Sequence, residues 1–190
     1  MKLIQLLEDP IKYIDPEDIK IENGVMILNQ FPNIVRNFDC HFLYELTSLK
    51  NCPQKITESF FCYNTGITSL EYAPKIIGST FGCSATKIVS LDYAPLECEK
   101  FDCAENNILH LKGIGRSYLK KCVELELTDT IKSNILGLCR IKNLETITID
   151  VDNSHPLYEA IQIVKKYLQT DGSDCAEELM QNGFNDYAKF

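Results

Sequence analysis

Cysteine and histidine are the side chains of this sequence that could do the most chemistry. The 190-residue chain contains nine cysteines and three histidines. A thiolate beside an imidazole is a nucleophile, and groups of Cys and His bind zinc. Zinc sites and redox dithiols usually contain a Cys-x-x-Cys pair, and no two cysteines here have that spacing. The cysteines are therefore not expected to bind a metal or to form a redox pair.

The histidines do not supply a partner for a reactive thiol. His110 and His155 lie in unrelated parts of the chain. Cys40 and His41 are adjacent, but neighbouring residues of a strand point to opposite faces of the sheet. We infer that these two side chains do not act together as nucleophile and base.

Other catalytic motifs are absent from the sequence or weak. It contains no phosphate-binding loop, no nucleotide-binding glycine triplet and no Gly-x-Ser-x-Gly. The Gly-rich stretch 113–117 (GIGRS) is not followed by the Lys and Ser of a phosphate loop, and the pair Glu177–Glu178 is typical of a solvated face. The sequence therefore predicts neither an enzyme nor a cofactor. One enzymatic alternative stays open, a pocket formed only in three dimensions between the repeats and the C-terminal helices.

Four of the cysteines mark an internal repeat, with successive spacings of 22, 21 and 20 residues: Cys40, Cys62, Cys83 and Cys103. Counted from a leading aliphatic residue, each unit has Phe at 4, Cys at 6, Thr or Asn at 9, Ile at 11, Leu at 14 and Ala-Pro at 17–18. The clearest units contain 60–74, 81–95 and 101–115. The unit around Cys40 carries one inserted residue, and the later units are looser. A period of this length predicts a solenoid.

The order of residue types within a unit has a physical reason. Side chains two apart on a strand share a face, so the Phe and Cys of each unit point into the interior together. One unit cannot bury this apolar edge, whereas stacked units can. We expect the cysteines to form one buried column of free thiols, and the Thr or Asn to hydrogen-bond loop backbone between coils.

These units resemble the leucine-rich repeat, and most of all its short bacterial type, whose outer arc is extended and contains proline. The resemblance covers residues 21–150, and it departs from the family in using Phe and Cys for two leucines and Thr for most asparagines. It implies an α/β fold: a solenoid with one curved, mostly parallel sheet, extended outer arcs and helical N- and C-terminal caps. The repeats and the final stretch EELMQNGFNDYAKF also resemble a group of tailed-phage proteins.

We expect a single domain over residues 1–190. Residues 1–20 are expected to form an N-terminal cap that begins with a short helix in KLIQLLEDP. The repeats are placed at 21–150 and a helical C-terminal cap at 151–190.

Within the C-terminal part, Pro156 is typical of a helix start, with Ser154 as a possible cap, and apolar spacing predicts a helix over 156–169. Ser173 or Asp174 could cap a final helix from about residue 175. A further helix is expected over 133–143.

The strand residues that flank each Phe and Cys should point away from the core, onto the concave face that such solenoids use for contacts. The candidate protein-binding residues are Asp39, His41, Phe61, Tyr63, Gly82, Ser84, Asp102, Glu124 and Glu126. Phe61 and Tyr63 are the expected hot spot because aromatic side chains are enriched at such sites. Alternatively, Phe61 packs beneath a cap or loop. Gly82 should leave a shallow notch, and the acidic end either meets a basic partner or keeps the edge soluble.

Composition narrows the range of partners. The formal net charge of -8 disfavours non-specific binding to nucleic acids and to anionic membranes. No apolar run reaches the length of a membrane span, and the start of the sequence does not resemble a signal peptide. A cytoplasmic location is therefore expected, which is the host cytoplasm if the protein is encoded by a phage.

Together these features predict a non-enzymatic protein-binding module. If the phage resemblance holds, the partner is a bacterial host protein, for instance a defence factor that is inhibited or modulated. The alternative is a structural protein that assembles into a homo-oligomer. An acidic nucleic-acid mimic has less support, because the carboxylates are scattered along the chain.

Overall fold

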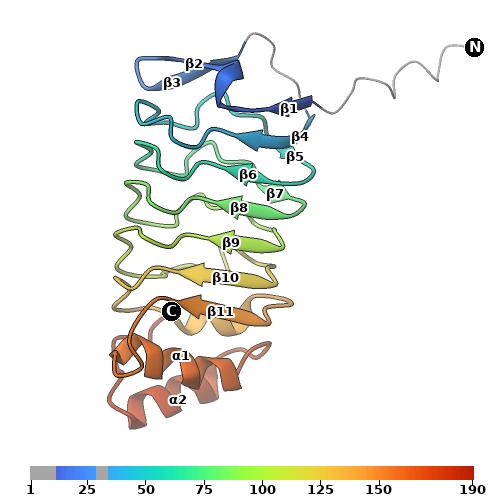
Figure 1. The fold of residues 1–190 in the computed structure, drawn as a ribbon. Coiled ribbons are helices and arrows are strands. Elements are labelled where there is room, and N and C mark those ends of the chain that lie inside the picture. The colour runs from blue at the N-terminus through green and yellow to red at the C-terminus, as the bar shows by residue number, and fades with distance from the viewer. Residues whose placement is uncertain (1–11, 29–33) are drawn as a thin grey trace, which may run out of the picture.

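The computed structural model describes residues 12–28 and 34–190, and it shows a parallel β-solenoid (Figure 1). Six strands lie one above another along its axis: β4 (Ile34–Asp39), β6 (Phe60–Phe61), β8 (Thr80–Gly82), β9 (Lys100–Asp102), β10 (Glu124–Leu127) and β11 (Thr146–Ile149). Every neighbouring pair in this series is parallel. The solenoid expected from the repeat is confirmed.

A second line of short strands precedes the first in each coil. β5 (Lys55–Ile56) pairs in parallel with β4 and with β7 (Ile76–Ile77). Single parallel bridges continue this line from Ile76 to Glu97, Lys121 and Lys142. Each coil therefore contacts its neighbours through two sets of backbone hydrogen bonds, and between them the chain runs as extended turns.

The core contains the columns that the repeat predicts. The phenylalanine rings of four successive coils stack with centroid distances of 5.2–5.3 Å: Phe38, Phe60, Phe81 and Phe101. The four repeat cysteines lie beside these rings, fully buried, and all nine cysteines of the chain are buried free thiols. Burial raises the pKa of each of these four thiols, most directly because a thiolate would lose its solvation. The column of buried free thiols is confirmed.

The Thr or Asn position hydrogen-bonds backbone, as expected. Thr65 Oγ1 donates to the carbonyl of Cys62 at 2.8 Å, within its own coil. Asn106 joins two coils, because its Nδ2 donates to the carbonyls of Cys83 at 2.9 Å and Cys103 at 3.0 Å. Its Oδ1 accepts from the backbone nitrogen of Thr86 at 2.9 Å. Asn106 is buried, so these bonds satisfy backbone groups that water does not reach.

The described N-terminal residues form strands and one short turn. β1 (Lys12–Ile14) pairs in parallel with β4, and the 3₁₀ turn η1 (Pro16–Asp18) follows it. An antiparallel hairpin of β2 (Ile19–Glu22) and β3 (Val25–Leu28) comes next. The helix expected in KLIQLLEDP lies outside the described residues. The expected boundary between the N-terminal cap and the repeats, at residue 21, falls inside β2. The hairpin of β2 and β3 therefore spans this boundary.

Two helices follow the last strand. α1 (Pro156–Lys166) falls within the helix expected over 156–169, and α2 (Ser173–Gln181) matches the final helix. The helices are tied together by Tyr167, whose hydroxyl donates to Glu178 Oε2 at 2.6 Å, and by an ion pair between Lys166 and Glu178. None of the helices in the described ranges is long and apolar enough to cross a membrane.

Three local expectations at this end were wrong. The stretch 133–143 holds only a 3₁₀ turn, η2 (Leu136–Arg140). The N-cap of α1 is His155, whose Nδ1 accepts from the backbone nitrogen of Leu157 at 3.2 Å, and not Ser154. The N-cap of α2 is Gly172, whose φ of 85° lies in the left-handed region that suits glycine.

Candidate functional site on the strand face

The strand register sets the predicted residues side by side. Phe61 lies between Asp39 and Gly82 on neighbouring strands, and Asp102 lies between Gly82 and Glu126. These residues form the central row of a surface that we call the strand face. The strand face also includes the residues two positions before and two positions after each of them along the chain. The inward residues beside the row, such as Phe60 and Phe81, are fully buried, so the row points outward.

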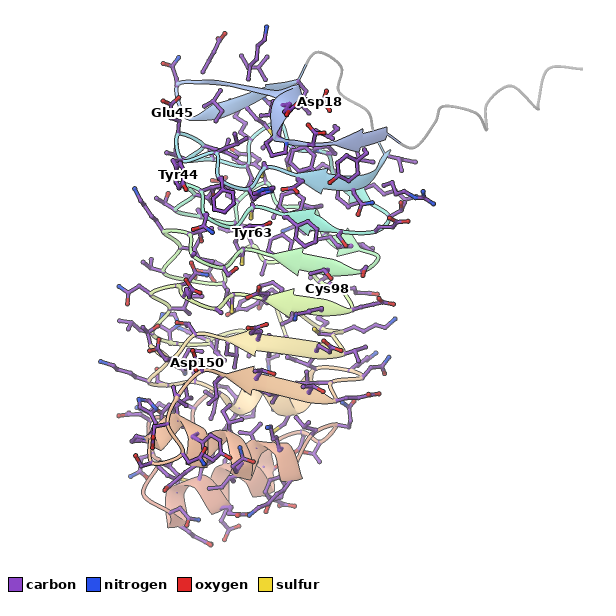
Figure 2. All side chains as sticks on the ribbon, viewed as in Figure 1. Asp18, Tyr44, Glu45, Tyr63, Cys98 and Asp150 are labelled. Atoms are coloured by element: carbon purple, nitrogen blue, oxygen red, sulfur yellow. The ribbon has the colours of Figure 1, made fainter. Side chains whose placement is uncertain are left out.

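Five aromatic or imidazole side chains gather at the N-terminal end of this face, and we call them the aromatic cluster: His41, Phe42, Tyr44, Phe61 and Tyr63. The rings of His41 and Tyr63 stack at 4.9 Å, and Phe42 meets them both edge-on at 4.9 and 5.9 Å. Phe61 and Tyr44 extend the cluster on either side. Figure 2 shows Tyr44 and Tyr63 near the upper strands. The exposed fractions of Phe42 and Tyr44 are 51% and 68%, so large apolar surfaces face solvent.

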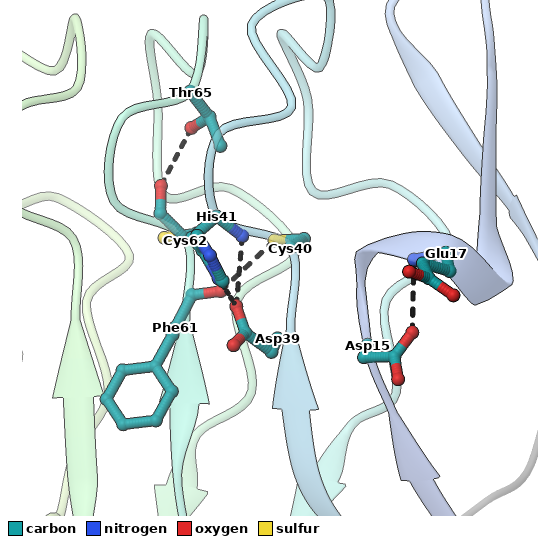
Figure 3. A network of polar contacts seen from close by, with 8 residues as sticks. All are labelled: Asp15, Glu17, Asp39, Cys40, His41, Phe61, Cys62 and Thr65. Carbon is teal, nitrogen blue, oxygen red and sulfur yellow. Dashed lines mark hydrogen bonds and ion pairs between the residues drawn. The ribbon is translucent and has the colours of Figure 1, made fainter.

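Within this cluster, the position of His41 is fixed by Asp39 (Figure 3). The Asp39 Oδ1 accepts from the backbone nitrogen of His41 at 3.0 Å and lies 2.5 Å from His41 Nδ1. Asp39 is only 8% exposed. Its carboxylate therefore orients the imidazole against Tyr63, and it is a support for the surface rather than an open contact group.

The notch expected at Gly82 is filled. Gly82 is buried, and a Cβ placed on it would lie 3.1 Å from Phe61 Cδ1 and 3.9 Å from Tyr63 Cδ1. The Phe61 ring thus lies over the glycine of the next coil and remains partly exposed. The expectation that Gly82 offers open contact surface was wrong, because the neighbouring aromatic side chain uses the space.

The other end of the face is acidic. Asp102, Glu124 and Glu126 come from neighbouring strands β9 and β10, and Lys100 Nζ lies 3.3 Å from Glu126 Oε2. Partial burial raises the pKa of Asp102, and repulsion from Glu126 acts in the same direction. Hydrogen bonds from the Ala104 nitrogen and the Ser84 side chain to Asp102 oppose this shift. The Ser84 side chain is partly buried beside the central row, and its hydroxyl stabilises the Asp102 carboxylate through this hydrogen bond.

Sequence reasoning missed Phe42 and Tyr44. Phe42 follows the strand at the position of Asn64, Ala85 and Glu105 in later coils, and all four residues have a positive φ between 50° and 57°. A bulky side chain is rare in this conformation, whereas asparagine tolerates it well. An aromatic residue at a turn position occupied elsewhere by small or polar residues was the signal that could have found it.

Two other features of the described part of the chain bear on possible sites. Within residues 12–28 and 34–190 no group of three or more His, Cys, Asp or Glu side chains could hold a metal ion. A small pocket lies at the opposite end of the solenoid from the aromatic cluster, between Ile114, Arg116 and Phe190. The guanidinium groups of Arg116 and Arg140 lie there, at 4.9 and 3.7 Å from the centre of the Phe190 ring.

The fold and this surface define a class: a parallel β-solenoid with an aromatic cluster exposed on its sheet. No family model, curated protein or solved structure matches the chain.

Proposed function

We propose that the protein is a non-enzymatic protein-binding module whose contact surface is the aromatic cluster and the adjoining strand face. The observation that carries this proposal is the contiguity of the cluster: Phe42 and Tyr44 are more than half exposed, yet they contact the His41–Tyr63 stack. Aromatic side chains with a large contact area and few rotatable bonds dominate many binding interfaces. An exposed group of them on one face marks an interaction site more often than a random surface feature.

The scaffold supports recognition at low entropic cost. Phe61 lies on β6, which is hydrogen-bonded to β4 and β8, and its neighbour Phe60 belongs to the stack of buried phenylalanines. The other members of the cluster lie in the turns that directly follow β4 and β6. His41 is further held by Asp39. Side chains that are already ordered lose little freedom when a partner binds, so more of the contact energy appears as affinity.

The kind of solenoid and the origin of the partner are also part of the proposal. We propose that the repeats are leucine-rich repeats of the short bacterial type. Because they resemble tailed-phage proteins, we propose a bacterial host protein as the partner. A small acidic module with a fixed binding face would suit a phage protein that inhibits or modulates a host defence factor in the cytoplasm.

Affinity purification from a bacterial lysate with three versions of the protein tests this proposal. Tyr44→Ala removes an exposed member of the cluster, and Tyr93→Ala is a matched control because Tyr93 is 57% exposed on an outer arc. Wild type and Tyr93→Ala should retain the same bacterial protein, and Tyr44→Ala should lose most of it. Equal capture by all three variants, or no captured protein, would contradict the proposed surface.

A further inference from the structure

We propose that the strand face binds an extended peptide segment in which an apolar side chain is followed or preceded, about four residues away, by an arginine or lysine. This inference rests on the proposed function and specifies the chemistry of its partner. It follows from the charge of the face, the distance between its two ends and the small side chains that separate them.

The charge of the face is unequal along its length. The aromatic cluster lies at the β1–β6 end, where Asp39 is already bonded to His41. At the β9–β11 end, four carboxylates stand against the single lysine Lys100: Asp102, Glu124, Glu126 and Asp150. Figure 2 shows Asp150 at the end of β11, far below Tyr63. A complementary segment therefore carries its apolar group at one end and its positive charge at the other.

The distance between the two ends comes from the register. Phe61, Gly82, Asp102 and Glu126 lie on four successive strands of one parallel sheet. Neighbouring strands are about 4.8 Å apart, so Phe61 and Glu126 are separated by roughly 14 Å. An extended peptide advances about 3.3 Å per residue, and it spans this distance in about four residues.

The residues between the Phe61 ring and the acidic end are small. Gly82 has no side chain, and Ser84 and Ala104 follow it on the same and the next coil. The Phe61 ring lies against Gly82, because its Cδ1 is 3.1 Å from the position of a Cβ on that glycine. A peptide can therefore run along the solenoid axis across the face without meeting a large side chain between the aromatic and the acidic ends.

A bound cation would also relieve an unfavourable arrangement. Asp102 and Glu126 are direct neighbours on β9 and β10, and Lys100 forms its ion pair with Glu126. Two carboxylates this close repel one another when both are ionised. A guanidinium placed between them could hydrogen-bond to both carboxylates, whereas Lys100 forms its ion pair with Glu126 and acts on Asp102 only through its charge.

The test is a selection from a random peptide library displayed on particles, followed by fluorescence anisotropy with the enriched peptides. Enriched sequences should pair an aromatic or large aliphatic residue with Arg or Lys three to five positions away. Affinity should fall about fivefold or more in the double variant Glu124→Gln/Glu126→Gln, and should weaken as ionic strength rises. Glu71→Gln, on an outer arc, is the matched control and should bind as the wild type does.

The outcomes separate this inference from the proposed function. Peptides that lose affinity with Tyr63→Ala but not with the Glu124→Gln/Glu126→Gln variant would overturn the inference and leave the binding surface standing. Peptides that bind equally well to Tyr63→Ala would count against the surface itself. A library without enriched sequences would overturn the inference, and so would a homodimer in light scattering that Tyr44→Ala dissociates, because the occupant would then be a second copy.

Discussion

The ring of Phe61 lies over the α-carbon of Gly82 on the next coil, so closely that a methyl group added to the glycine would meet Phe61 Cδ1 at 3.1 Å. The pair joins the aromatic and the acidic halves of the strand face. Because Phe61 is a surface side chain and not backbone, it can move aside when the glycine is changed. The geometry of the binding face and the stability of the fold are therefore separable at this position.

Gly82→Ala should alter binding much more than stability. The added methyl group pushes the Phe61 ring outward, and the change in the free energy of unfolding should stay below about 1 kcal/mol. Partner or peptide affinity should fall because the face is no longer flat. Thermal denaturation and an affinity measurement on the same sample check both parts.

Gly78→Ala is the contrasting variant. A Cβ at Gly78 would lie 1.9 Å from the carbonyl oxygen of Thr57, which is backbone of the preceding coil. This variant should be severely destabilised although it lies away from the aromatic cluster. If Gly78→Ala melts like the wild type, or Gly82→Ala unfolds, the packing described here is incorrect.

Phe42→Asn should weaken binding without lowering stability. Phe42 has a φ of 57°, and the equivalent Asn64 shows that asparagine is accommodated in the same turn. For an L-residue other than Gly, Asn or Asp the left-handed conformation costs roughly 1–2 kcal/mol, which the variant recovers in part. The melting temperature should therefore stay level or rise while capture of the partner declines. A drop in melting temperature would show that the ring is held for packing and not for contact.

Asn106→Ala should be strongly destabilising. It removes the bonds to the carbonyls of Cys83 and Cys103 and leaves the Thr86 nitrogen without its side-chain acceptor. Each buried polar group left unsatisfied costs about 1–3 kcal/mol, so a loss of several kcal/mol is expected in denaturant titrations. Asn107→Ala is the control, because Asn107 is exposed on the adjacent position. Similar midpoints for the two variants would refute the bridging role of Asn106.

The thiols should be inert in the native protein. All nine cysteines are buried and free, and burial raises the pKa of the four in the repeat column. Because all nine thiols are buried away from solvent, a thiol reagent should label almost nothing until denaturant is added, and then all nine positions. Mass spectrometry counts the labels. Rapid labelling of Cys62 or Cys83 under native conditions would contradict a closed column.

Asp102→Asn should change how stability depends on pH. The folded-state pKa of Asp102 is raised above its ordinary value of 3.8, so the ionised carboxylate costs stability as pH rises through the folded-state pKa. The asparagine variant should be the more stable protein at neutral pH, and the difference should shrink as the pH approaches about 4. Melting curves at several pH values measure this. A variant less stable at neutral pH would mean that the ion attraction of Lys100 outweighs the burial and repulsion.

The interior of this protein could be predicted from its sequence because every coil repeats the same residue types. Phe60 and Phe81 stack since each lies 21 residues from the other at the same place in its unit. The strand register followed, and with it the outward direction of Phe61 and Glu126. One line of reasoning, periodicity, supplied all of this.

The surface could be predicted only in part, because the conformations of exposed side chains depend on contacts between neighbouring coils. The position of Phe61 over Gly82 is a contact between two coils that no spacing within one coil reveals. The turn after Cys40 carries an inserted residue, so Phe42 and Tyr44 had no reliable place in the template. The bond of Asp39 to the nitrogen two residues later is, by contrast, a local preference of aspartate that the sequence does suggest.

The parallel strand pairs of the described chain join residues only 20 to 24 positions apart. A growing polypeptide therefore needs to expose little more than one further turn before that turn can dock on the one already formed. Assembly can keep pace with synthesis on the ribosome, without long stretches waiting for a distant partner. One contact is longer in range, since Tyr187 and its neighbour Asp186 return to residues 131–135, more than fifty positions back, and can form only after residues 186 and 187 have emerged.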